Sequence, residues 1–341
     1  MSATPTVSVI IPTHQRRESL GAVIEPLLAD PALRELVVAV DGSTDGTAEW
    51  LEQRGSRDSR LTVLQLPNRG VSAARQAGLE AATSDLVLFL DDDVVPGRGL
   101  VTGHARRHAA EAHVLVQGYT PNDWRRLRRS RRAIARIYRN GYEQTCARYE
   151  REPELVLRGF WGGNFSLRRA DCQDVGIANP LFGRGAREED REFGIRCLKA
   201  GLRGVFDRRL VGDHRYDRDL TSFRRDCRES GRYRRMIHDL HPDVVGHDLT
   251  DRTGTANTLD RPGQGLPRPV RRVLAILASP PLFRLLAGVL AAGFWIGVLV
   301  GSISLQTLTA RGVGSLETQR GVSDQRASGT GPAGRASPSA G

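Results

Sequence analysis

The sequence is almost without lysine, and several patterns that mark common protein classes are missing from it. Lys199 is the only lysine among 341 residues, so the formal net charge of +11 rests on arginine. The N-terminus, MSATPTVSVIIP, has no basic region followed by a long apolar core, so no secretory signal peptide is expected. No C-x-x-C pair occurs, which argues against a zinc cluster and fits reduced thiols. The four cysteines are Cys146, Cys172, Cys197 and Cys227.

The excess of arginine has two explanations. A GC-rich coding sequence favours arginine without any functional reason. The alternative is attraction to anions, such as nucleic acid, phosphate groups or an acidic membrane surface. Composition alone leaves both open.

Short apolar runs alternate with helical stretches in the first half of the chain. β-Branched and leucine-rich runs ended by Pro, Asp or Asn predict buried strands. We expect strands at 7–11, 36–40, 61–66, 86–90, 114–117 and 165–167. We expect helices at 16–28, 44–54, 71–82, 104–111, 123–150 and 187–200. Strand and helix alternating at this spacing predict an α/β fold with a mostly parallel central sheet and flanking helices.

The organisation changes in the C-terminal third. Residues 1–240 form the expected globular domain, and 241–272, rich in Gly, Pro, Thr and Asp, form an expected linker. Within the expected membrane-associated segment 273–306, residues 285–305 carry no charge. The Gly/Ser/Arg-rich stretch 307–341 predicts a disordered tail.

Polar signals follow three of the predicted strands at their carboxyl ends. They are Pro12-Thr13, Asp41-Gly42-Ser43 and Asp91-Asp92-Asp93. In an open parallel sheet, ligands bind beyond these ends. We therefore expect one binding site formed by all three.

Three adjacent carboxylates in LVLFLDDDVVP repel one another, so folding alone gives no reason to place them together. A hard divalent cation prefers carboxylate oxygen and keeps ligand positions for substrate phosphates. The alternative is a solvated acidic loop or a helix N-terminus. Their position directly after LVLFL favours a metal site.

Two further stretches carry weaker signals. Asp41 opens DGSTDGT, which either forms a plain turn with a helix cap or supplies a carboxylate to a nucleobase N–H. LPNRGVSAARQAG begins with turn residues and opens a helix, whose first N–H groups attract an anion. Arg75 would point toward the sheet edge, or would be an ordinary surface arginine.

Taken together and in this order, the motifs resemble the inverting family 2 glycosyltransferases, which have the GT-A fold. The resemblance covers roughly residues 5–235. It rests on VSVIIPTHQR, VVAVDGSTDGT, NRGVSAARQAG, LVLFLDDDVVP, WGGNFSLRR and REEDREFGIRCLKAG.

The resemblance implies a role for each site residue. The donor nucleotide sugar would be bound by Thr13, Asp41, Arg75, Asp91 and Asp92, with Asp41 and Arg75 on the base. The aspartate run matches the DxD element of the family, and the metal would be held by Asp93, Asp91 and His214. A lone histidine is more often structural than a metal ligand.

The acidic motif REEDREF implies the catalytic residues. Asp190 would be the general base, with Glu189 beside it. Because Glu188 extends the row, the assignment can shift by one position.

The implied activity is a hexosyl transfer that depends on Mn²⁺ or Mg²⁺. The donor would be a UDP- or dTDP-sugar, with guanine still open as the base. The acceptor would be a hydroxyl or phosphate of a glycan or lipid-linked molecule, in cell-envelope glycan or glycolipid synthesis.

Two segments point toward a membrane. Residues 124–140 carry eight arginines among apolar residues, and 285–305 are long enough to span a bilayer. Arginines before the apolar segment place its N-terminal side, and the catalytic domain, in the cytoplasm at the cell membrane. A solvated helix face and a helix docked on the soluble domain remain the alternatives. Gly293, Gly297 and Gly301 form a small-xxx-small pattern that would allow a homodimer.

Other functions fit less well. A dinucleotide-dependent oxidoreductase needs G-x-G-x-x-G after the first strand, where this chain has IPTHQR. A polysaccharide synthase needs several spans and Q-x-x-R-W, which is missing. The remaining alternative is a basic membrane- or nucleic-acid-binding protein without transferase activity, which would not need the acidic strand ends. We expect no nucleic acid partner.

Overall fold

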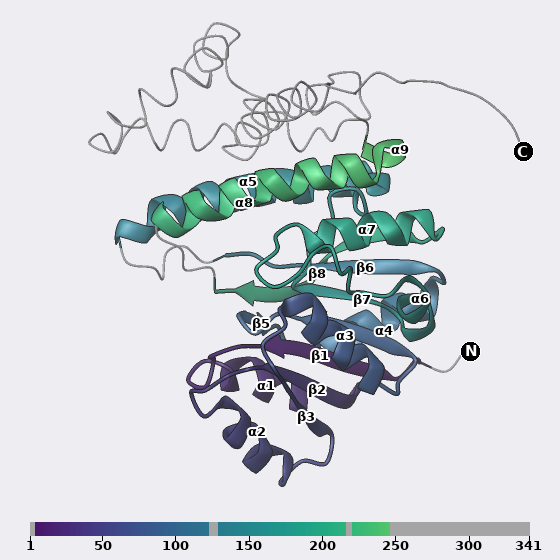
Figure 1. The fold of residues 1–341 in the computed structure, drawn as a ribbon. Helices are drawn as coiled ribbons and strands as arrows, with labels where there is room; N and C mark the ends of the chain where they lie inside the picture. Colours follow the sequence, from purple (N-terminus) through teal and green to yellow (C-terminus); the bar gives the residue numbers. More distant parts are fainter. Residues whose placement is uncertain (1–3, 123–128, 216–219, 246–341) are drawn as a thin grey trace, which may run out of the picture.

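The computed structural model of the chain describes residues 4–122, 129–215 and 220–245 (Figure 1). The expected membrane-associated segment 273–306 and tail 307–341 lie outside the described residues, as does the expected linker from residue 246 onward. In the part that is described, no helix combines the length and the apolar character that a bilayer crossing requires.

A single eight-stranded mixed sheet forms the centre of the fold, in the order β3-β2-β1-β4-β7-β6-β8-β5. Parallel pairing joins β1 to β2 and β4, β2 to β3, and β6 to β8, while β7 runs antiparallel between β4 and β6. The strands are β1 Val7–Thr13, β2 Leu33–Asp41, β3 Leu61–Leu66, β4 Leu86–Leu90, β5 Val94–Pro96, β6 Val114–Tyr119, β7 Asn164–Arg168 and β8 Arg203–His214.

Helices cover both faces of the sheet, so its central strands are buried on both sides. Along β1, Val9 and Ile11 pack into one apolar cluster and Ile10 into the other, as the two-residue period of a strand requires. The helices are α1 Gly21–Leu28, α2 Thr47–Gly55, α3 Val71–Ala81, α4 Leu100–Ala110, α5 Arg129–Arg151, α6 Arg169–Val175, α7 Glu189–Lys199, α8 Leu220–Leu240 and α9 Pro242–Val245, with a short 3₁₀ turn at Pro153–Leu155.

All six expected strands are present, and 61–66 and 86–90 have the expected bounds. The structure adds β5, β8, α6 and the long helix α8, which the sequence patterns did not predict. In β8 only alternate residues are buried, and arginines and aspartates interrupt its apolar residues, so no apolar run marks it. The domain also continues past the expected boundary at 240, because α9 packs Val245 against Ile195 and Ile237.

A buried polar cluster joins α4 to the sheet. His104 lies 2.7 Å from Ser166 Oγ through Nδ1 and 3.0 Å from Asn164 Oδ1 through Nε2, and His108 Nε2 lies 2.8 Å from the same hydroxyl. Burial lowers the pKa of His104 to about 3 and that of His108 to about 4. Both imidazoles are therefore neutral in the folded protein at neutral pH.

This cluster predicts a loss of stability in mild acid. An unfolded histidine has a pKa of about 6.5, above both folded values, so the unfolded chain binds more protons as the pH falls from about 6.5 to 4. We expect each histidine to contribute a fall of about 1.4 kcal/mol per pH unit to the free energy of unfolding in this window. Urea unfolding at several pH values measures the slope.

Relative to the unsubstituted protein, His108→Asn should reduce this contribution by about 1.4 kcal/mol per pH unit, whatever its own cost in stability. His113→Asn is the matched control, because the His113 side chain is 76% exposed and its φ of +52° suits asparagine. Equal slopes in His108→Asn and the unsubstituted protein would contradict the assignment.

Candidate active site

A cavity of about 430 Å³ opens beyond the carboxyl ends of β1, β2 and β4. It contains every residue that the sequence singled out for a role, although they come from six separate stretches of the chain. Its lining includes Thr13, Asp41, Arg75, Asp91, Asp92, Asp93, Glu189, Asp190 and His214. The fold therefore brings the expected donor, metal and catalytic residues into one space.

Asp41 ends β2 with its carboxylate already bound by the backbone. Its Oδ1 accepts a hydrogen bond from the Arg69 N–H at 2.7 Å, and its Oδ2 accepts one from the Gly70 N–H at 2.7 Å. Gly70 has a φ of +99°, and a Cβ there would lie 2.9 Å from Arg184 Cα, so this turn requires glycine. Asp41 thus fixes the start of α3, and only its remaining lone pairs can receive a ligand N–H.

Arg75 is a buried side chain and not the surface arginine of the alternative hypothesis. Its Nη2 donates to Asp91 Oδ1 at 2.6 Å, and the residue is 5% exposed. Burial acts to lower its pKa, but the charges of Asp91, Glu189 and Asp190 raise the pKa on balance. Arg75 therefore stands electrostatically between the aspartate run and the acidic pair of α7.

The three adjacent aspartates face different partners. Asp91 pairs with Arg75, as described above. Asp92 Oδ1 lies 3.2 Å from Arg16 Nε, and Asp93 Oδ2 lies 3.6 Å from Arg16 Nη2. Burial raises the pKa of Asp92 to about 6 despite Arg16. Arg75 and Arg16 thus supply much of the positive charge that the Asp91–Asp93 carboxylates need nearby.

Asp93 also faces His214, the last residue of β8. The distance from His214 Nε2 to Asp93 Oδ1 is 3.6 Å, and the Tyr138 ring lies edge-on to the imidazole with centroids 5.9 Å apart. The described residues hold no group of three or more His, Cys, Asp or Glu that could enclose an ion. A cation at this place would have only a few protein ligands and would need phosphate and water to complete its shell.

The structure separates the three acidic residues at the start of α7. Glu188 caps the helix with a φ of +63°, and its Oε2 accepts from Arg234 Nε at 3.0 Å. Glu188 does not line the cavity, whereas Glu189 and Asp190 do. The candidates for the general base therefore narrow from three residues to two, Glu189 and Asp190.

Asp190 is held rigidly by backbone donors. Its Oδ2 accepts from the Gly162 N–H at 2.6 Å and its Oδ1 from the Arg191 N–H at 2.8 Å. Burial raises the pKa of both Asp190 and Glu189, with further increases from the charge of Glu188 and of Asp190 respectively. A carboxylate whose pKa lies closer to neutrality is a better proton acceptor for catalysis.

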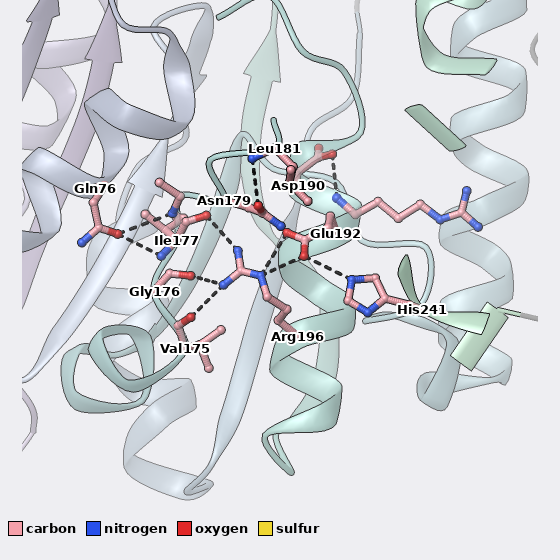
Figure 2. Close-up of polar contacts among 12 residues, drawn as sticks. Gln76, Val175, Gly176, Ile177, Asn179, Leu181, Asp190, Glu192, Arg196 and His241 are labelled. Atoms are coloured by element: carbon pink, nitrogen blue, oxygen red, sulfur yellow. Dashed lines mark hydrogen bonds and ion pairs between the residues drawn. The ribbon is translucent and has the colours of Figure 1, made fainter. Parts of the chain in front are cut away.

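Figure 2 shows how α7 itself is fixed. Arg196 donates from Nη1 to the carbonyls of Val175, at 2.7 Å, and Gly176, and from Nη2 to that of Ile177 at 3.1 Å. Its Nε donates to Glu192, which is 1% exposed and lies 3.2 Å from His241 Nε2. The helix that carries Asp190 is thereby tied to the loop after α6 and to the start of α9.

The cavity also includes residues that the sequence analysis did not select. His14, Arg16 and Trp161 lie in stretches that carried the resemblance, and only Thr13 was chosen from the first of them. Arg187 opens another of these stretches, REEDREFGIRCLKAG, and was not chosen from it. Tyr138 had no such signal, because its position in the cavity depends on how α5 folds back over the sheet.

Comparison with known proteins finds the same family that the motifs resemble. The family described as "Glycosyl transferase family 2" matches residues 8–176. The succinoglycan biosynthesis protein ExoU of Rhizobium meliloti is 29% identical over 188 residues, 54% of this chain and 50% of that protein. An undecaprenyl-phosphate 4-deoxy-4-formamido-L-arabinose transferase of Pectobacterium carotovorum is 38% identical over 96 residues, 26% of this chain and 29% of that protein. The chain thus spans half or less of the length of these two relatives.

Among solved structures, the fold is similar to that of the mannosyltransferase PcManGT from Pyrobaculum calidifontis, which was solved in complex with GDP-Man and Mn²⁺. The TM-score is 0.57 at 17% identity, covering 92% of this chain and 88% of that one. This likeness confirms the expected GT-A-like α/β fold with its mostly parallel sheet and flanking helices.

The network around Arg196 predicts a large effect on stability. Arg196→Met removes the donor from three carbonyls and leaves the buried Glu192 with only His241, so we expect a loss of about 3 kcal/mol in the free energy of unfolding. Chemical denaturation measures it. The control is Arg203→Met, whose side chain is 66% exposed with one ion pair to Glu111 and should cost less than about 1 kcal/mol. Similar losses in the two variants would contradict the role of Arg196.

Proposed function

This chain belongs to glycosyl transferase family 2, and from that premise we propose that it transfers a sugar from a nucleoside diphosphate sugar to an acceptor, with inversion at the anomeric carbon. The observation that supports this most is the juxtaposition across Arg75. It places the Asp91–Asp93 carboxylates, suited to a donor diphosphate, beside the acidic pair suited to proton removal.

The donor nucleotide would lie over Thr13, Asp41 and α3. The anchored Asp41 carboxylate keeps lone pairs for a base N–H, which we propose is that of uracil or thymine. The GDP-Man in the mannosyltransferase structure keeps guanine as the alternative.

The Asp91–Asp93 carboxylates offer the oxygen ligands that Mn²⁺ or Mg²⁺ prefers, although they and His214 do not form a ready-made three-residue ion site, so a bound cation would also need donor phosphate and water. Asp93, Asp91 and His214 would hold it, and when bound it would stabilise the negative charge of the departing diphosphate. One Asp91 oxygen is bound by Arg75, and the other faces Gly163, where a Cβ would lie 3.0 Å from Oδ2. Glycine at this position keeps that oxygen accessible.

Asp190 would act as the general base. Its oxygen would take the proton of the acceptor hydroxyl while the acceptor oxygen bonds to the anomeric carbon and the bond to the diphosphate breaks on the opposite side. The two backbone N–H groups fix the direction of the Asp190 carboxylate. The negative charge of Glu189 beside it increases the affinity of the Glu189–Asp190 pair for a proton.

We also propose that the acceptor is a glycan or lipid-linked molecule used in cell-envelope synthesis, at the cytoplasmic face of the cell membrane. The names of the two curated relatives, which refer to succinoglycan and to undecaprenyl phosphate, support this class of acceptor. The uncharged stretch 285–305 supports the membrane location by its sequence alone. The homodimer stays a prediction.

Nucleotide binding gives the first test. A thermal-shift panel of UDP, dTDP, GDP and ADP, with and without Mn²⁺, should show stabilisation by one of them that requires the metal. Asp93→Asn should reduce this metal-dependent shift, because it removes a carboxylate from the expected cation site. Asp174→Asn, an exposed residue of α6, is the control and should leave the shift intact. Stabilisation by none of the nucleotides would argue strongly against a transferase.

The assignment of the base gives the second test. Asp190→Asn should lower transfer by at least about 10³-fold while nucleotide binding survives, since the amide cannot accept the proton. Glu188→Gln should lower transfer by less than about tenfold, because Glu188 pairs with Arg234 outside the cavity. Loss of nucleotide binding in Asp190→Asn, or an equal loss of transfer in Glu188→Gln, would show that the roles are assigned wrongly.

A further inference from the structure

Helix α8 has one face packed on the domain and one face in solvent. Toward the domain, Ile237 and His238 are buried, and Tyr233 packs against Phe182 with ring centroids 5.5 Å apart. The opposite face carries four arginines, which we call the arginine stripe: Arg225, Arg228, Arg232 and Arg235. Their spacing of three, four and three residues places them in one row along the helix.

Little negative charge offsets the stripe. Asp239 pairs with Arg235 at 3.2 Å, and Asp226, which bonds Arg187 on the cavity side, lies 3.9 Å from Arg225 Nε. For Arg228 and Arg232, which are exposed, no carboxylate of a described residue lies within ion-pair distance. The row is thus a concentrated positive surface at the helix centre.

The exposed face of α2 differs from this one. The solvent-facing residues of α2 include Glu49 and Glu52, and Arg54 of that helix pairs with Glu25 at 2.5 Å. An excess of arginine across the whole chain would not by itself place four on one face of α8, whose acidic residues are the partly buried Asp226 and Glu229 and the exposed Asp239. A flat row of uncompensated guanidinium groups is suited to a surface of phosphate groups.

We propose that the arginine stripe docks the domain on an anionic phospholipid bilayer. The four side chains extend over about 15 Å of helix, at 1.5 Å per residue, and present guanidinium forks that match headgroup phosphates. Leu240, 38% exposed at the end of the same helix, adds an apolar contact beside the charges. The chain that follows carries the uncharged stretch 285–305, which suits the same partner.

The inner side of α8 connects this surface to the cavity. Asp226 accepts from Arg187 Nη2 at 2.7 Å, and Arg187 lines the cavity. Arg234 donates to Glu188, the residue before the acidic pair. A bilayer on the outer face of α8 would therefore lie one helix away from the cavity rim. Docking itself does not depend on the proposed transferase activity.

The test uses the full chain and two double variants with the same change in net charge. Arg228→Gln with Arg232→Gln removes the centre of the stripe. Arg34→Gln with Arg57→Gln is the control, because both are exposed arginines, in β2 and in the turn after α2, and these elements lie at the opposite end of the domain from α8 (Figure 1). Co-sedimentation compares vesicles of phosphatidylcholine with vesicles containing 30% phosphatidylglycerol, at two salt concentrations.

We expect the stripe variant to bind the phosphatidylglycerol vesicles about 25-fold more weakly, from about fivefold for each arginine, and the control variant to bind like the unsubstituted chain. The unsubstituted chain and both variants should bind phosphatidylcholine vesicles equally. Any contribution of the uncharged stretch 285–305 is then the same in each and cancels when they are compared. Thermal unfolding should be unchanged in both variants. An equal loss of binding to phosphatidylglycerol vesicles in both variants would overturn the proposal. Equal binding of the unsubstituted chain to both kinds of vesicle would overturn it too. A stripe variant that loses binding to single-stranded RNA but still binds phosphatidylglycerol vesicles would also overturn the proposal, and would assign the stripe to nucleic acid.

Discussion

The ion pair between Arg75 and Asp91 is the interaction on which the site depends. A buried guanidinium requires nearby carboxylates, and here it has Asp91 on one side and Glu189 and Asp190 on the other. This guanidinium lets the fold keep the aspartate run and the acidic pair of α7 close together with limited repulsion. It also couples α3, the end of β4 and the start of α7, which are far apart in the sequence, into one rigid floor of the cavity.

This arrangement explains why an unfavourable run of three aspartates is tolerated. Asp91 pairs with Arg75, Asp92 and Asp93 share Arg16, and Asp93 also faces His214. Burial still raises the pKa of Asp92, because Arg16 does not fully offset the loss of water around its carboxylate. Such a site is less than fully neutralised by the protein, which suits it to a bound cation. The rigidity of the α7 network then keeps the acidic pair at a fixed position opposite.

The sheet was predictable because β1, β2 and β4 contain continuous apolar runs, which are buried in the folded domain. β8 and α8 were not, because neither is apolar in sequence. Half of β8 faces solvent or ion pairs, and its residues become a strand only by pairing with β6 and β5. α8 is mostly polar and gains its stability from one narrow face, where Ile237 and Tyr233 meet the domain.

By itself, the sequence determined the α/β alternation, the polar residues at the strand ends and the family resemblance, because these are local patterns of period, charge and spacing. Only the tertiary structure decided which carboxylates share a cavity. It turned Glu188 toward Arg234 and left Asp190 between two backbone N–H groups, and it added Arg16 and Arg187 to the lining. The physical reason is that ionisation and access depend on neighbours brought together from distant parts of the chain, and no local pattern encodes those distances.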